Sequence, residues 1–145
     1  MEDISGTGIE INLIAIPTFP AGLTLNAFAD DTDPLDTPEL QTADWGMGVN
    51  GDLVIWNTPK PIEVTLGMIP ETDQEKNLAL LADANRPAKG KLTTKDSIIM
   101  TVTYPDGTRK TLTSGRLVAS IPLTPVASAG RFKSKPYRFI FENKL

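Results

Sequence analysis

Residues 46–51 read Gly-Met-Gly-Val-Asn-Gly and match the GxGxxG pattern of dinucleotide-binding loops. In such a loop the pyrophosphate rests on the N-terminus of a helix that follows the glycines. Here the pattern is followed by Asp-Leu-Val-Ile-Trp at residues 52–56, which is typical of a strand. The glycines are therefore interpreted as a flexible hairpin turn, and no cofactor is expected.

A second set of candidate residues is acidic and could provide cation ligands. These acids lie in residues 30–45, a segment that also has two prolines and shows little periodicity. An EF-hand spacing counted from the second of these acids lacks the turn glycine, and Thr42 stands where the closing glutamate belongs. A long, solvated acidic surface loop is therefore expected, and no metal site. Its candidate contact residues are Asp30, Asp31, Asp33, Asp36, Glu39 and Asp44.

The chain has no histidine and no cysteine, so the usual general base, the commonest metal ligand and thiol nucleophiles are all missing. No GxSxG pattern is present either, which excludes a catalytic triad of the familiar form. Pairs of carboxylates could still converge in space, and a metal-dependent hydrolase built on the acidic loop stays open as a remote alternative. The sequence predicts a protein that is not an enzyme.

Most of the elements that would position these residues are strands. Alternation of apolar residues predicts strands near residues 9–13 and 23–27, and Asn50-Gly51 predicts a hairpin with a type I′ turn. Further strands are expected at 62–66, 98–104, 111–113, 117–121 and 137–141, with a turn at 105–107.

One helix is expected, over about residues 72–85. Thr72 can cap it while Glu75, three residues later, completes a capping box. Leu78, Leu81 and Ala82 lie on one stripe, with Leu80 beside it.

At 145 residues, with 40% hydrophobic and 22% charged residues, the chain fits a single globular domain, 1–145. About seven or eight short strands and one flanking helix predict a mainly β (α+β) fold, a β-sandwich or half-barrel. No signal peptide or membrane span is evident, so a soluble product without membrane anchoring is expected. A β-sandwich module binding carbohydrate or protein through Trp45, Trp56 or Tyr104 is an alternative.

Charge divides unevenly along the chain. Residues 1–85 carry a net charge of −13 and residues 86–145 one of +9. Neutralisation between neighbouring strands accounts for part of this asymmetry, and the rest favours head-to-tail association of identical copies into rings or filaments. The candidate basic subunit-interface residues are Arg131, Lys133, Lys135 and Arg138. With an acidic first half, sequence-specific nucleic-acid binding is not expected.

Four stretches of the chain are distinctive: GDLVIW at 51–56, residues 61–86, MTVTYPDGT at 100–108 and residues 128–143. Together they resemble the small tail proteins of contractile-tailed bacteriophages, and the tube subunit in particular. The tube protein of type VI secretion is similar in architecture.

The resemblance implies a tail-tube-like fold in hexameric rings, stacked into a hollow tube through which DNA passes without specific contacts. It also implies sheath and baseplate proteins as partners, and a place in the virion tail after assembly in the bacterial host cytoplasm. The acidic loop, about 30–45, would contact the next ring, and carboxylates of residues 1–85 would line the lumen. A baseplate or tail-completion subunit of the same tail is the alternative within this class.

Overall fold

The computed structural model describes residues 1–145 and contains nine strands and one helix. The elements in chain order are β1 (Glu10–Ile16), β2 (Phe19–Leu25), β3 (Leu35–Asp36), β4 (Ala43–Met47), β5 (Leu53–Asn57), β6 (Ile62–Met68), α1 (Asp73–Asn85), β7 (Ser97–Thr103), β8 (Arg109–Ser120) and β9 (Lys135–Lys144). The predicted mainly β fold with a single helix is confirmed.

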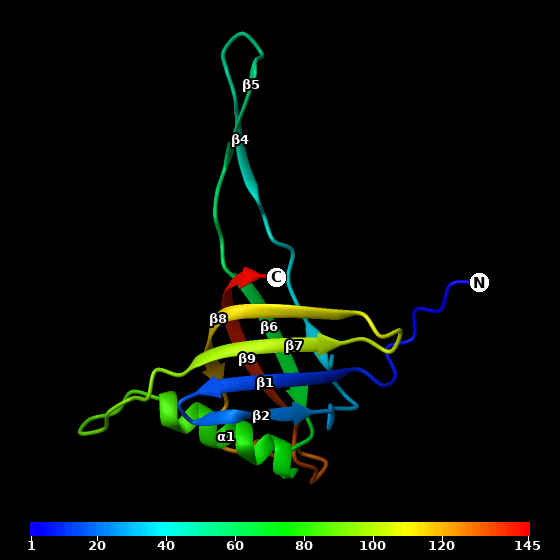
Figure 1. The fold of residues 1–145 in the computed structure, drawn as a ribbon, viewed down its shortest axis with the longest axis vertical. Helices are drawn as coiled ribbons and strands as arrows, with labels where there is room; N and C mark the ends of the chain where they lie inside the picture. The colour runs from blue at the N-terminus through cyan, green and yellow to red at the C-terminus, as the bar shows by residue number, and fades with distance from the viewer.

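Seven strands form one antiparallel sheet in the order β2-β1-β7-β8-β9-β6-β3. The sheet curls, so that β6 and β9 cross behind β1 and β7 as a half-barrel (Figure 1). The long strand β8 takes part in both halves, and its pairing with β7 shifts register beside Ser114, where φ is +55°. A bulge of this kind bends a strand and increases its twist, which lets one strand turn the corner of the half-barrel.

The core lies inside this curl. Alternate residues of β1, β7 and β9 point inward, as the period of two requires. Gly115 opens room for one of the largest of them, because a Cβ at this position would come within 2.3 Å of the Phe141 ring. The fully buried large side chains are Ile11, Leu13, Leu25, Leu66, Met68, Leu78, Leu81, Ile98, Met100, Tyr137, Phe139 and Phe141.

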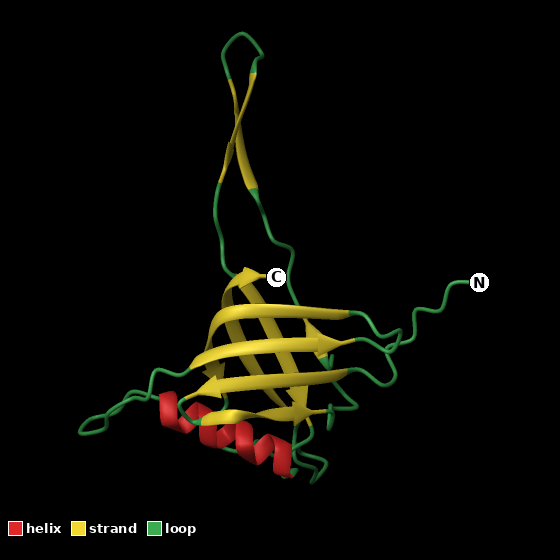
Figure 2. Ribbon diagram, in the orientation of Figure 1, coloured by secondary structure: helices red, strands yellow, loops and turns green.

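Helix α1 packs along the open side of the curl, next to β2 (Figure 2). As predicted, the Thr72 hydroxyl accepts a hydrogen bond from the Glu75 amide at 3.3 Å, and Leu78 and Leu81 are buried whereas Leu80 is exposed. The other half of the capping box does not form, because the Glu75 carboxylate points into the protein.

The hairpin predicted at Asn50-Gly51 is present as β4 and β5, which form a sheet of their own. Its turn differs from the predicted type I′, because Gly51 has φ of +88° whereas Asn50 does not have a positive φ. The Gly51 amide donates to the Gly48 carbonyl at 2.9 Å, and the Gly48 amide to Asp52 at 2.8 Å. The loop therefore has three residues and ends on a left-handed glycine, the next commonest hairpin geometry.

Candidate assembly surfaces

The hairpin formed by residues 43–57, here called the arm, is largely exposed. The arm stands away from the body, which comprises the seven-stranded sheet and α1 (Figure 2). Its ladder pairs Ala43 with Asn57 and Met47 with Leu53, and the Thr58 amide extends it by donating to the Thr42 carbonyl at 3.0 Å. An isolated two-stranded hairpin is only marginally stable in water, so this geometry is typical of a segment completed by a partner.

One side of the arm, the apolar face, consists of large hydrophobic side chains. Trp45 pairs with Ile55 and Met47 pairs with Leu53, so the four side chains share one side of the ribbon. They are 63%, 60%, 65% and 58% exposed, respectively. A contiguous apolar surface of this kind on a soluble domain marks an interaction site.

The other side of the arm, the acidic face, combines apolar and charged residues. Asp44 pairs with Trp56, and Val54 pairs with Gly46, so these residues share this side, as does Asp52 by the alternation of the strand. The Trp56 ring lies across the glycine, 3.9 Å from where a Cβ there would stand. Both faces of the arm therefore offer apolar surface to a partner.

The sequence did contain a signal for this arm. Residues 53–56, Leu-Val-Ile-Trp, are apolar without alternation, which indicates a strand that meets apolar surface on both sides. Periodicity alone does not say whether the same chain or another copy supplies that surface.

The body also presents unpaired strand edges. Strand β2 pairs only with β1, which leaves its outer edge open. At the opposite end of the sheet, β3 covers β6 at Thr65 and Leu66, and loop residues on either side of β3 bond to much of the rest of that edge. Only the first residues of β6 lack a strand partner on this side. Strand edges of this kind are templates for pairing with another chain.

The predicted acidic contact residues are not held together. Asp30 forms an ion pair with Arg131 at 2.5 Å, and this pairing lowers the pKa of the carboxyl. Asp31 accepts a hydrogen bond from Ser134. The rest are distributed over the loop that crosses β6 (Asp33), β3 (Asp36), the segment leading to the arm (Glu39) and β4 (Asp44). No group of three or more acidic side chains is placed to hold a metal ion.

The predicted basic interface residues also occupy different environments. Arg131 and Lys133 are exposed in the segment before β9, and Arg138 is exposed on β9. Lys135 is buried, and its ammonium lies 2.8 Å from a carboxylate oxygen of Glu75. The charge of Lys135 is thus neutralised inside the body rather than presented to a neighbour.

The buried pair fixes the start of α1 to β9. The Tyr137 hydroxyl donates to Glu75 at 2.7 Å, beside the lysine. Burial raises the pKa of Glu75, but the hydrogen bonds from Lys135 and Tyr137 outweigh it, so the pKa is lowered overall. Burial and the adjacent carboxylate both raise the pKa of Tyr137. Glu75 therefore stays ionised, and Tyr137 stays protonated, at neutral pH.

A second buried carboxylate, Asp96, fixes the other end of α1. It accepts hydrogen bonds from the Thr18 amide at 2.9 Å, the Thr94 hydroxyl at 2.7 Å and the Asn85 side chain at 2.7 Å. Burial raises its pKa, but these hydrogen bonds outweigh burial and lower it overall. Both carboxylates thus act as structural anchors of the helix.

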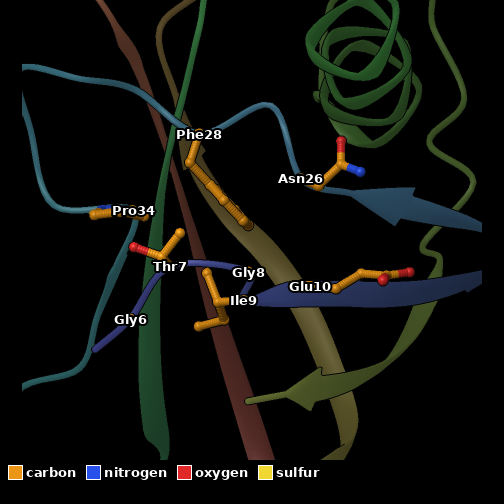
Figure 3. A pocket seen from close by; sticks show the side chains of 8 residues that line it. All are labelled: Gly6, Thr7, Gly8, Ile9, Glu10, Asn26, Phe28 and Pro34. Atoms are coloured by element: carbon orange, nitrogen blue, oxygen red, sulfur yellow. The ribbon is translucent and has the colours of Figure 1, made fainter. Parts of the chain in front are cut away.

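A hollow of about 670 Å³ lies between the N-terminal segment and the loop after β2 (Figure 3). It is lined mostly by uncharged residues such as Gly6, Thr7 and Phe28, and Glu10 is its one ionisable side chain. It presents neither paired carboxylates nor a nucleophile beside a base. Separately, α1 is too short and too polar to cross a membrane.

Residues 2–145 match the family described as tail fiber protein gp32. No match was found among curated protein sequences. The fold is similar to the anti-feeding prophage cap, a tube-terminating cap, with a TM-score of 0.56 and 10% identity over 100% of this chain and 91% of that chain. It is also similar to the sheath/tube terminator of the extracellular contractile injection system PVC in its extended state. The TM-score is 0.56 and the sequence identity 11%, over 100% of this chain and 96% of that chain.

A third similar structure comes from the anti-feeding prophage baseplate, with a TM-score of 0.52 and 10% identity over 100% of this chain and 95% of that chain. At such identities these structures establish the fold, whereas the family match extends over nearly the whole sequence. The chain belongs to the tail fiber protein gp32 family, which makes it a phage tail-related protein.

Proposed function

We propose that this protein is a structural, non-enzymatic subunit of the inner tube of a contractile phage tail, assembled as stacked hexameric rings. The observation that carries the proposal is the arm, whose apolar face is more than half exposed at each of its four large side chains. Burying such side chains contributes roughly 1.5–3 kcal/mol each, so a neighbouring copy gains substantial free energy by covering them. The similar solved structures, which include a tube cap and a terminator, support a fold suited to tube assembly.

The open sheet edges provide the lateral contact within a ring. The outer edge of β2 in one copy pairs with the start of β6, near Ile62, in the next copy. Because the two edges differ, the contact is heterologous and closes into a ring when the rotation between copies allows it. Joining the edges also removes two aggregation-prone templates.

The outer face of the front half of the sheet is suited to line a lumen. Asn12 pairs with Thr24 on one side and Thr101 on the other, and Thr101 pairs with Thr111. Hydrogen bonds join neighbours in this row, at 3.0 Å between Thr24 and Asn12 and 3.3 Å between the hydroxyls of Thr101 and Thr111. The row itself offers no cation to DNA phosphates. Beside it on the same face, Arg109 is balanced by Glu10, since both residues pair with Thr103, so the face carries no net positive charge to retain DNA.

Electron microscopy of the purified protein tests the proposal. At high concentration, wild-type protein should form rings and stacked tubes, whereas a variant with residues 43–57 replaced by a short Gly-Ser linker should remain folded but monomeric. The two proteins should have similar far-ultraviolet circular dichroism from the body. Isolated wild-type monomers at both low and high salt, with no recruitment by tail sheath or baseplate proteins, would contradict a tube role.

A baseplate or tail-completion subunit is the second candidate. It is favoured by the similarity to a terminating cap, a sheath/tube terminator and a baseplate. A terminator presents one face to the tube and blocks further stacking, so it should give single rings at any concentration. Particle length as a function of concentration therefore separates the two roles.

A further inference from the structure

The segment between β8 and β9, residues 121–134, forms a compact projection, here called the 121–134 loop. Val126 and Phe132 are joined by a β-bridge. The Ala127 amide donates to the Arg131 carbonyl at 2.7 Å, and the Lys133 amide donates to Pro125 at 2.8 Å. The loop is therefore a small preformed hairpin that loses little conformational entropy on binding.

The surface of this loop is both apolar and basic. Leu123, Val126 and Phe132 are 80%, 61% and 45% exposed. Its charged residues are Arg131 and Lys133, and it has no acid. Asp30 already pairs with Arg131, whereas Lys133 has no ion-pair partner within the chain.

The acidic face of the arm has the complementary character. It presents Val54 and Trp56 beside Asp44 and Asp52, and the arm contains no basic residue. The apolar face lacks charge, so only the acidic face matches the loop in both hydrophobicity and charge.

The two surfaces lie at opposite ends of the molecule. The arm occupies one end of the long axis, and the orange 121–134 loop lies near the other end, beside α1 (Figure 1). An arm cannot reach the loop of its own chain in this arrangement, but it can reach the loop of a copy placed end to end with it.

We propose that the acidic face of the arm of one copy docks on the 121–134 loop of a second copy, with Asp52 near Lys133. This contact rests on the proposed function and specifies how successive rings adhere, because a head-to-tail contact repeats without closing. The apolar face then remains available for a different neighbour. Electrostatic complementarity sets which surfaces meet, and burial of Trp56 and Val54 against Phe132 and Val126 holds them together.

A charge-exchange cycle tests the contact in the full-length protein. Asp52→Lys and Lys133→Asp should each weaken assembly about tenfold, measured as the midpoint concentration for sedimenting particles, and the double variant should recover most of the loss. The matched control combines Asp52→Lys with Lys89→Asp, because Lys89 is an exposed lysine in another loop. That control pair should show no recovery.

A second readout uses the tryptophans, of which the chain has two, one on each face of the arm. In a Trp45→Phe background the remaining Trp56 should shift its emission to shorter wavelength on assembly, and Lys133→Asp should reduce that shift. Particles that form equally well with Asp52→Lys, or a double variant no better than the single ones, would overturn the contact but leave the tube proposal standing. Failure of wild-type protein to assemble would overturn both.

Discussion

The body and the arm are made of strands of similar composition, yet they place their apolar side chains in opposite environments. In the body, Phe139 and Phe141 are completely buried inside the curl. In the arm, Trp45 and Ile55 are more than half exposed. The difference lies in the number of layers, since a curled sheet with a helix encloses a core and a two-stranded ribbon cannot.

This contrast indicates that the two regions obtain their stability from different sources. The body depends on contacts within one chain, including two buried carboxylates that anchor both ends of α1. The arm lacks such contacts within its own chain, and in the proposed assembly a second copy supplies them. Substitutions in the body should therefore lower the free energy of unfolding, and substitutions in the arm should lower assembly.

The largest effect is expected for Lys135→Ala. Removing the lysine leaves the buried Glu75 carboxylate without its cation, which should lower the free energy of unfolding by about 3 kcal/mol in urea denaturation. Lys133→Ala, two residues earlier and exposed, is the matched control and should change it by less than about 0.5 kcal/mol. Equal effects of the two substitutions would show that the buried pair is not an anchor.

The second largest loss of unfolding free energy is expected for Gly115→Ala. Its Cβ would come within 2.3 Å of the Phe141 ring, so the ring must move within a packed core, at a cost of about 1–3 kcal/mol. Gly6→Ala, which meets no atom within 4 Å, serves as the control. Thermal unfolding followed by circular dichroism measures both, and an unchanged midpoint for Gly115→Ala would contradict the close packing at this site.

Acid should destabilise the body through Asp96. Its pKa is lowered in the folded state from an ordinary value of 3.8, so its contribution is complete above that value and is lost as the pH falls toward the folded pKa. Asp96→Asn should flatten the decline of unfolding free energy between about pH 5 and about pH 2. If the free energy of unfolding falls with pH equally in the variant and the wild type, the titration of Asp96 does not contribute to acid destabilisation.

The smallest effect on the body is expected from the double substitution Trp45→Ser and Ile55→Ser. Because neither residue contributes to the core, the free energy of unfolding should change by less than about 0.5 kcal/mol. Ring and tube formation should be lost, as observed by electron microscopy. A large loss of body stability would show that the arm packs on its own body.

Much of the body could be predicted from the sequence because its signals are local. The Thr72 cap and the Leu78 and Leu81 stripe predicted α1 to within a residue, and alternation predicted β1 and β9. The joining of two expected strands into β8 was missed, because a bulge at Ser114 breaks the alternation without ending the strand.

The placement of the charged residues could not be predicted. Lys135 and Lys133 are two residues apart in one basic segment, yet one pairs with buried Glu75 and the other faces solvent. Which of the two lysines is buried depends on the long-range pairing of β9 with β6 and on the packing of α1. The separation of the arm from the body is likewise a tertiary property that no local pattern encodes.

The most direct test of the central claim is the emission of Trp45 in a Trp56→Phe variant, which reports on the apolar face of the arm alone. Spectra are recorded for dilute monomer and for assembled particles, with the arm otherwise unchanged. Burial by a second copy predicts a shift to shorter wavelength and protection from quenching by iodide on assembly. Particles whose Trp45 retains the emission and quenching of the monomer would contradict it.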